Sequence, residues 1–134
     1  MPNQVRLHLF LPVLKNAFLT AEGAVTLIEE NTHYSLYRAN ILIIGYGRIG
    51  KALHNILKGY GAYVTVCSRS KESEADSVFN GAKHISFNDL KSANDADIII
   101  NTVPLKPIFV ITHTVKHKLI AYSVKHMAFC RHRK

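Results

Sequence analysis

The chain has 134 residues, enough for one domain with a buried core but few for an enzyme that must hold both a cofactor and a substrate. Hydrophobic residues make up 48% of it, and no apolar run approaches the roughly 18 residues that a membrane helix needs, so we expect a cytoplasmic protein without a membrane span. The formal net charge is +8, but the acid-free stretch after residue 97 contributes +7, so the basic character belongs to the C-terminal tail.

The first predicted helix follows an N-terminal segment, residues 1–19, for which the sequence indicates no role. Thr20 can cap the start of this helix, and an apolar stripe at helical spacing follows it. The stripe runs out near Asn31, where we expect the helix to end. This helix therefore precedes the first strand.

A buried strand is predicted over Asn40–Ile44, because the run is continuously apolar and rich in β-branched residues. A glycine turn joins this strand to the next predicted helix. Such a turn is typical of a site for a dinucleotide pyrophosphate, where helix N–H groups face the anion. A glycine turn without a ligand and, for Arg48, simple exposure to solvent are the alternatives. The candidate phosphate-binding residues are Gly45, Tyr46, Gly47, Arg48, Ile49 and Gly50.

Strands and helices alternate along the rest of the pattern. We expect a helix over 49–57, a strand over 62–67, a helix over 72–79, a strand over 83–87, a helical turn capped by Asn88 and a strand over 97–101. This alternation predicts an α/β fold, a Rossmann-like doubly wound parallel sheet with its ligand crevice at the carboxyl ends of the strands.

The pattern deteriorates beyond Pro104, so the sheet is expected to be incomplete after the fourth strand. We assign residues 20–107 to a dinucleotide-binding domain and residues 108–134 to a basic, histidine-containing tail. Whether the tail folds after Thr112 is left open by its partial helical periodicity.

The residues after the second strand bear on the choice of cofactor. NAD-binding domains carry an acidic residue there for the adenosine ribose, whereas an arginine suits the 2′-phosphate of NADP. This chain has no carboxylate at that point and offers positive charge and hydroxyl groups instead. NADP is therefore the predicted cofactor, with NAD and a solvated basic loop as alternatives. The residues expected to recognise the phosphate are Ser68, Arg69, Ser70 and Lys71.

The end of the fourth strand is a second candidate contact for the cofactor. Its sequence is Asn-Thr-Val-Pro, at the place where the nicotinamide half passes in sheets of this kind. The candidate residues are Thr102, Val103 and Pro104. A strand stop enforced by the proline is the equally favoured alternative.

The sequence indicates no catalytic residue and no metal site. His33, His54 and His84 have no evident carboxylate or nucleophile as a partner, so structural or surface roles are favoured. Cys67 is expected to be a small buried hydrophobic residue. A zinc site in the tail is disfavoured because its spacing matches no compact finger; its ligands would be His113, His117, Cys130 and His132.

A competing interpretation gives the tail a binding role. Its lysines and arginines would attract RNA, DNA or an acidic membrane surface through counterion release. Tyr122 and Phe129 are its only rings beyond residue 112, so recognition by base stacking is not expected. We therefore expect neither a membrane nor a nucleic acid as the main partner.

Four stretches of the chain together resemble the C-terminal, cofactor-binding part of the A-type subunit of dipicolinate synthase. They are the run that opens with Thr-Ala-Glu-Gly at residue 20, the glycine turn, Val-Thr-Val-Cys-Ser-Arg ending at residue 69, and Asn-Thr-Val-Pro ending at residue 104. The resemblance covers about residues 18–108. It implies NADP-linked oxidation of a dihydrodipicolinate-type intermediate to dipicolinate. It also implies a small dicarboxylate substrate, a partner that is the flavoprotein, B-type subunit of the same synthase, and a place in the mother cell during sporulation.

The chain departs from this family at both ends. The family carries a separate N-terminal domain, and its later Asp-Leu-Ala-Ser-like strand end and Pro-Gly-Gly segment do not occur in this sequence. A truncated or frame-shifted gene would produce such a basic tail. An isolated nucleotide-binding fragment without catalysis is therefore an alternative to a complete enzyme.

Overall fold

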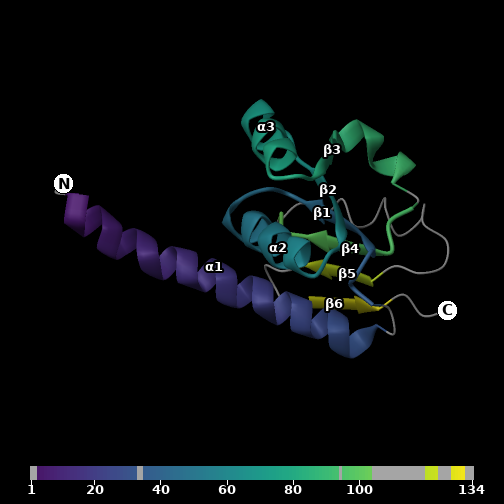
Figure 1. The fold of residues 1–134 in the computed structure, drawn as a ribbon, viewed down its shortest axis with the longest axis horizontal. Coiled ribbons are helices and arrows are strands. Elements are labelled where there is room, and N and C mark those ends of the chain that lie inside the picture. The colour runs from purple at the N-terminus through teal and green to yellow at the C-terminus, as the bar shows by residue number, and fades with distance from the viewer. Residues whose placement is uncertain (1–2, 33–34, 94, 104–119, 124–127, 132–134) are drawn as a thin grey trace.

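The structure, a computed structural model of the chain, describes residues 3–32, 35–93, 95–103, 120–123 and 128–131. Helices and strands alternate along it from β1 to β4 (Figure 1). In chain order the elements are α1 (Asn3–Asn31), β1 (Asn40–Ile44), α2 (Arg48–Gly59), β2 (Tyr63–Cys67), α3 (Lys71–Phe79), β3 (Lys83–Ile85), η1 (Phe87–Ser92), β4 (Ile98–Asn101), β5 (Ile120–Ser123) and β6 (Ala128–Arg131).

The strands form one six-stranded sheet in the order β3-β2-β1-β4-β5-β6. The pairs from β3 to β5 are parallel, and β6 runs antiparallel to β5. β1 lies between β2 and β4, and all but the first of its residues are buried. This position explains why its sequence is continuously apolar. The predicted α/β, Rossmann-like doubly wound sheet is confirmed.

The sequence predicted a sheet that is incomplete after its fourth strand, but two further strands continue it. β5 pairs with β4, and β6 pairs with β5. Each of these strands has four residues and lies within a basic segment with scattered apolar residues. Neither has the continuous β-branched run that marks β4, so the hydrophobic pattern did not indicate them.

Two apolar layers cover the sheet. Ile41, Ile43 and Val66 pack with α1 and α2 on one face of the sheet. On that face α1 lies next to α2 and contacts it (Figure 1). Leu42 and Ile44 point to the other face and pack with residues of η1. The alternation of side chains along a strand sends neighbouring residues to opposite faces, so a fully apolar β1 serves both layers.

α1 begins at Asn3, well before Thr20, so the prediction of a helix capped by Thr20 is wrong. The Thr20 hydroxyl donates a hydrogen bond to the carbonyl oxygen of Asn16, 2.8 Å away, inside the helix. Threonine makes such a bond as readily as it caps a helix, which is why the sequence misplaced the start. Figure 1 shows the N-terminal part of α1 extending beyond the rest of the domain.

The turn after β3 is also placed differently from the prediction. η1 begins at Phe87 with Ser86 in the N-cap position, so Asn88 is not the cap. The Ser86 hydroxyl donates to a carboxylate oxygen of Asp89 at 2.9 Å. Serine and asparagine are both favoured at caps, so composition alone did not separate the two positions.

Gly50 and Gly59 of α2 form a matched pair for testing how this helix packs. A Cβ at Gly50 would lie 2.5 Å from the carbonyl oxygen of Gly45, whereas a Cβ at Gly59 would meet no atom within 4 Å. We expect Gly50→Ala to lower the free energy of unfolding by about 1–3 kcal/mol through overpacking. Gly59→Ala should raise it by about 0.5 kcal/mol through helix propensity. Urea unfolding measures both values, and equal stability of the two variants would contradict the described packing.

Candidate dinucleotide-binding site

The carboxyl ends of three neighbouring strands meet at one edge of the sheet. Ile44, at the end of β1, pairs with Cys67 at the end of β2 and with Asn101 at the end of β4. The chain leaves β1 toward β2 on one side and later returns to β4 on the other side. Ligands of open α/β sheets bind at such a switch point. The glycine turn, the residues after Cys67 and the residues after Asn101 therefore lie together, as predicted.

Gly45 begins the turn in a conformation that favours glycine. Its φ is +96°, and its N–H donates to the carbonyl oxygen of Cys67 at 2.8 Å. A Cβ at this position would collide with Thr102 Oγ1 and would lie 2.7 Å from Val103 Cγ1. A side chain is therefore excluded both by the backbone and by the residues that follow β4.

Gly47 stands directly before α2 and has open space where a side chain would be. It is exposed, its φ is −81°, and a Cβ there would meet no atom within 4 Å. The first N–H groups of a helix have no partner within that helix, and they carry its positive dipole end. A pyrophosphate fits this space, because the absent side chain lets an anion approach those N–H groups.

Arg48 and Ile49 contribute differently to the start of α2. Arg48 is exposed, so its guanidinium is accessible to a ligand. Ile49 is partly buried and packs against the core layer shared by α1 and α2. Ile49 is therefore suited to contact a phosphate through its backbone N–H and not through its side chain.

The side chain of Tyr46 is buried, with 6% exposure. Its hydroxyl lies 2.7 Å from Nδ1 of His54, which is itself only 3% exposed. Burial, followed by the nearby Asp76 carboxylate, raises the pKa of Tyr46. The ring of Tyr46 thus anchors the glycine turn to α2, and a contact with the cofactor is left to its backbone.

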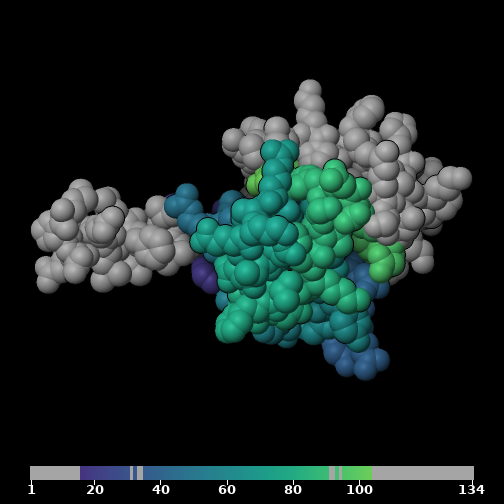
Figure 2. Space-filling model, turned by 90° about the horizontal axis from the view of Figure 1, so that it is seen from above, coloured from purple at the N-terminus to yellow at the C-terminus, as the bar shows by residue number. Residues whose placement is uncertain are grey.

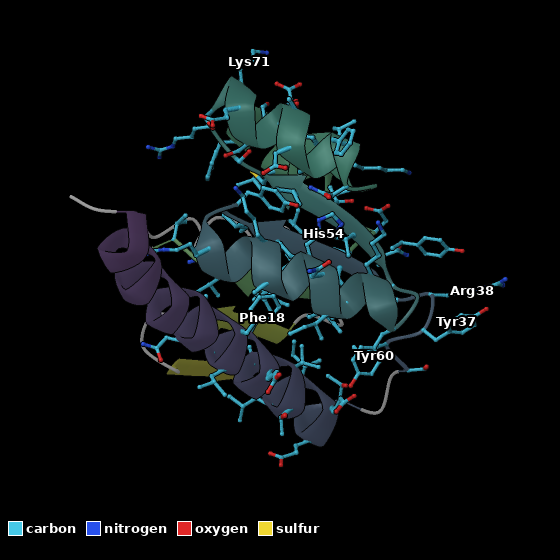
Figure 3. All side chains as sticks on the ribbon, turned by 60° about the vertical axis from the view of Figure 1, so that its left-hand side comes forward. Phe18, Tyr37, Arg38, His54, Tyr60 and Lys71 are labelled. Atoms are coloured by element: carbon cyan, nitrogen blue, oxygen red, sulfur yellow. The ribbon has the colours of Figure 1, made fainter. Side chains whose placement is uncertain are left out.

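A polar network joins α2 to α3 around the Tyr46–His54 pair. The Lys51 ammonium lies 2.9 Å from a carboxylate oxygen of Asp76, and Lys58 donates to the carbonyl oxygen of Asn80 at 3.0 Å. These residues line a cavity of about 130 Å³. Figure 3 shows His54 on the side of α2 that faces α3. Burial, and then the charge of Lys58, lowers the pKa of His54, while Asp76 opposes this shift.

The expected structural role of His54 is thus confirmed, and its partner is Tyr46. His84 has a partner as well, because its Nε2 lies 2.8 Å from the Ser68 hydroxyl. The sequence did not reveal either pair, since each joins different elements of the fold. The strand register, which pairs Val66 with His84 and Cys67 with Ile85, shows that the ends of β2 and β3 lie together. His33 lies outside the described residues.

The four residues after β2 are two serines, whose hydroxyls form hydrogen bonds within the domain, and two exposed cations. Ser68 is buried beside His84, and the Ser70 hydroxyl caps α3 by accepting from the N–H of Ser73 at 3.0 Å. Arg69 is exposed, and its guanidinium carbon lies 5.0 Å from the centroid of the Phe87 ring. The Lys71 ammonium lies 3.2 Å from a Glu74 carboxylate oxygen on an exposed helix start (Figure 3).

The residues after β4 tie that strand to β1. Both the N–H and the hydroxyl of Thr102 donate to the carbonyl oxygen of Ile44, at 2.9 and 2.8 Å. The N–H of Val103 donates to the side-chain oxygen of Asn101 at 3.1 Å. Thr102 and Val103 therefore shape the floor beneath Gly45, and Pro104 lies outside the described residues.

Cys67 is fully buried, as expected, and burial raises the pKa of its thiol to about 12. Such a thiol stays protonated and is a poor nucleophile. Within the described ranges, no group of three or more histidine, cysteine or acidic residues is placed to hold a metal ion. Of the proposed tail ligands, His113, His117 and His132 lie outside these ranges, and Cys130 is described only as part of β6.

The comparison with protein families identifies the class of this domain. Residues 17–128 match the family described as the NAD-binding domain of D-isomer-specific 2-hydroxyacid dehydrogenases, and the chain belongs to this family. Membership supports a nicotinamide dinucleotide as the cofactor. In the part of the chain that the structure describes, no helix has the length and apolarity to cross a membrane.

Particular relatives confirm the resemblance to dipicolinate synthase. The chain is 31% identical over 90 residues to the A-type subunit of dipicolinate synthase from Bacillus subtilis, a match that covers 66% of this chain and 30% of the relative. It is 36% identical over 72 residues to glyoxylate reductase from Thermococcus kodakarensis, covering 54% of this chain and 21% of that protein. The chain therefore spans less than a third of the length of these relatives.

Solved structures agree with this assignment. The crystal structure of the A chain of dipicolinate synthase from Bacillus subtilis matches with a TM-score of 0.78 and 26% identity, over 82% of this chain and 38% of that one. Its counterpart from Bacillus halodurans matches with a TM-score of 0.77 over 81% of this chain and 38% of that one; at 22% identity it shows the shared fold alone.

Replacing His54 with glutamine tests the Tyr46–His54 anchor. Near pH 7.5 we expect wild type to be more stable by about 1 kcal/mol, because the variant loses the bond to Tyr46. Below the ordinary pKa of 6.5 the unfolded chain binds a proton at His54 that the folded chain resists. The wild-type advantage should therefore shrink as the pH falls below 6.5. Urea unfolding across this range measures it, and an advantage that grows toward acid pH would refute the burial of a neutral His54.

Proposed function

We propose that this chain is the cofactor-binding domain of an oxidoreductase of the dipicolinate synthase type, with the dinucleotide pyrophosphate at residues 45–50. The open space at Gly47 carries this proposal. Gly45 and Gly50 lack side chains because neighbouring atoms leave no room, whereas Gly47 has nothing within 4 Å of its Cβ position. Packing does not explain that glycine, but an anion in front of the N-terminus of α2 does.

The proposal includes NADP as the preferred cofactor, with Arg69 as the residue that selects it. Arg69 is exposed at the end of β2, where the stretch 68–71 contains no acidic residue for the ribose hydroxyls of NAD. A guanidinium matches the geometry of a phosphate and can bind it through two parallel hydrogen bonds. The hydroxyls of Ser68 and Ser70 are engaged with His84 and Ser73, so they add less than the sequence suggested.

The nicotinamide half would pass the end of β4, where Thr102 and Val103 supply backbone and side-chain surface. When bound, the cofactor supplies hydride transfer, and this chain binds and orients it. His54 and His84 are held by Tyr46 and Ser68, so neither is proposed as an acid or base. We propose no catalytic residue, and the alternative to a complete enzyme is an isolated nucleotide-binding fragment without catalysis.

The reaction, substrate and partner that we propose follow from the likeness to the A-type subunit of dipicolinate synthase. They are oxidation of a dihydrodipicolinate-type intermediate, a small dicarboxylate, and the flavoprotein, B-type subunit of that synthase, in the cytoplasm of the mother cell during sporulation. The tail, for which binding to a nucleic acid or an acidic surface was the competing role, lies mostly outside the described residues.

Arg69→Ala should remove the preference for NADPH. We expect the variant to bind NADPH about ten- to a hundredfold more weakly, the cost of hydrogen bonds to a charged group, and to bind NADH as before. Lys83→Ala is the control. It also removes one exposed positive charge, but at the start of β3, where the strands have their amino ends and not their carboxyl ends. Calorimetric titration of wild type and both variants with NADPH and NADH measures all six affinities. Equal affinities of the wild type for NADPH and NADH would refute the NADP assignment.

Gly47→Val should abolish the binding of both nucleotides while the domain stays folded. The backbone at Gly47 has φ −81° and ψ −158°, an extended conformation open to residues other than glycine, and a Cβ there would meet no atom within 4 Å. The stability of the valine variant should therefore stay within about 0.5 kcal/mol of wild type. Calorimetry and urea unfolding provide the two readouts, with Gly59→Ala as the control that keeps binding. Retained binding in the valine variant would mean that the nucleotide site lies elsewhere.

A further inference from the structure

We propose that Phe87 is a positioning residue that holds Arg69 ready for the 2′-phosphate of NADP; this inference rests on the proposed function. The guanidinium carbon of Arg69 lies 5.0 Å from the centroid of the Phe87 ring. The two residues come from different parts of the chain, the end of β2 and the start of η1. They meet because Cys67 pairs with Ile85 at the ends of β2 and β3.

Phe87 is fixed on its inner side by the core. It is partly buried and packs against the apolar layer that contains Leu42, Ile44 and Cys67. Seen from above, the surface of α3 continues into that of the coloured residues that follow it, as far as residue 90 (Figure 2). A ring held in this way gives the mobile arginine side chain a fixed platform at the strand ends.

A cation–π contact suits this task because it leaves the arginine donors available. The ring attracts the cation through its face and has no hydrogen-bond acceptor of its own, so the contact uses none of the guanidinium N–H groups. A salt bridge would instead occupy some of those donors, as the Glu74 carboxylate does for the neighbouring Lys71. Arg69 on Phe87 is therefore ordered before the cofactor arrives, which lowers the entropy lost on binding.

This arrangement predicts a selective effect on one nucleotide. Without the ring, Arg69 has to be ordered by the phosphate itself, so NADPH binding should weaken about two- to fivefold, the range of an exposed cation–π contact. NADH carries no 2′-phosphate, so its binding should not change. A ring with a merely structural role would affect both nucleotides alike.

The experiment compares NADPH and NADH affinities by calorimetry for the 134-residue wild type, Phe87→Leu, Phe87→Met and Phe87→Tyr. We expect both non-aromatic variants to lose NADPH affinity selectively and the tyrosine variant to keep it. In an Arg69→Ala background, Phe87→Leu should have no further effect on NADPH. Phe79→Leu, which replaces a ring that is 90% exposed at the end of α3, should behave as wild type.

The outcomes separate this inference from the function on which it rests. A wild type that binds the two nucleotides equally would overturn the NADP assignment, and the role of Phe87 with it. A wild type that prefers NADPH, with the preference unchanged or increased in both non-aromatic variants, would overturn the role of Phe87 alone. Equal losses for NADPH and NADH would also overturn it, because they would show a structural effect.

Discussion

The close approach of Gly50 in α2 to the carbonyl oxygen of Gly45 determines how the rest of this domain is arranged. A Cβ at Gly50 would lie 2.5 Å from that oxygen, so the helix can begin this close to β1 only where a side chain is missing. Thr102 closes the other side, because it binds the carbonyl oxygen of Ile44 and fills the space beside Gly45. The start of α2 is thereby directed at the edge where the strands end, and the positive end of its dipole faces that edge.

Specificity in this site depends on few side chains, because most polar groups are already engaged within the domain. The hydroxyls of Ser68, Ser70 and Thr102 each hold an internal hydrogen bond. Tyr46 is turned away toward His54. What remains for a cofactor in the proposed site is the backbone of the glycine turn, which does not distinguish one nucleotide from another, and the exposed guanidinium groups of Arg48 and Arg69, of which Arg69 follows β2, where the adenosine ribose would lie. In this proposal, binding and discrimination are separate properties of separate loops.

The sequence predicted the fold and the position of the glycine turn where the evidence was local. The β-branched run of β1 and the three glycines are contiguous, so the strand, the turn and α2 could be read from them directly. The start of α1 was misplaced because a threonine can cap a helix or lie within it. β5 and β6 were missed because neither carries a continuous β-branched run such as the three isoleucines of β4. The contacts of Tyr46, Ser68 and Arg69 depend on strand order and register, which no single stretch of sequence contains.

The central claim, that the open turn before α2 is the nucleotide site, is tested most directly by locating the bound cofactor. Two-dimensional NMR of the 15.0 kDa chain, labelled with nitrogen-15 and titrated with NADPH, reports every backbone amide separately. We predict that the largest shifts fall on the amides of residues 45–50 and 68–71. Repeating the titration with NADH should keep the first group of shifts and reduce the second. A folded chain whose amides in the glycine turn do not respond to either nucleotide would contradict this account.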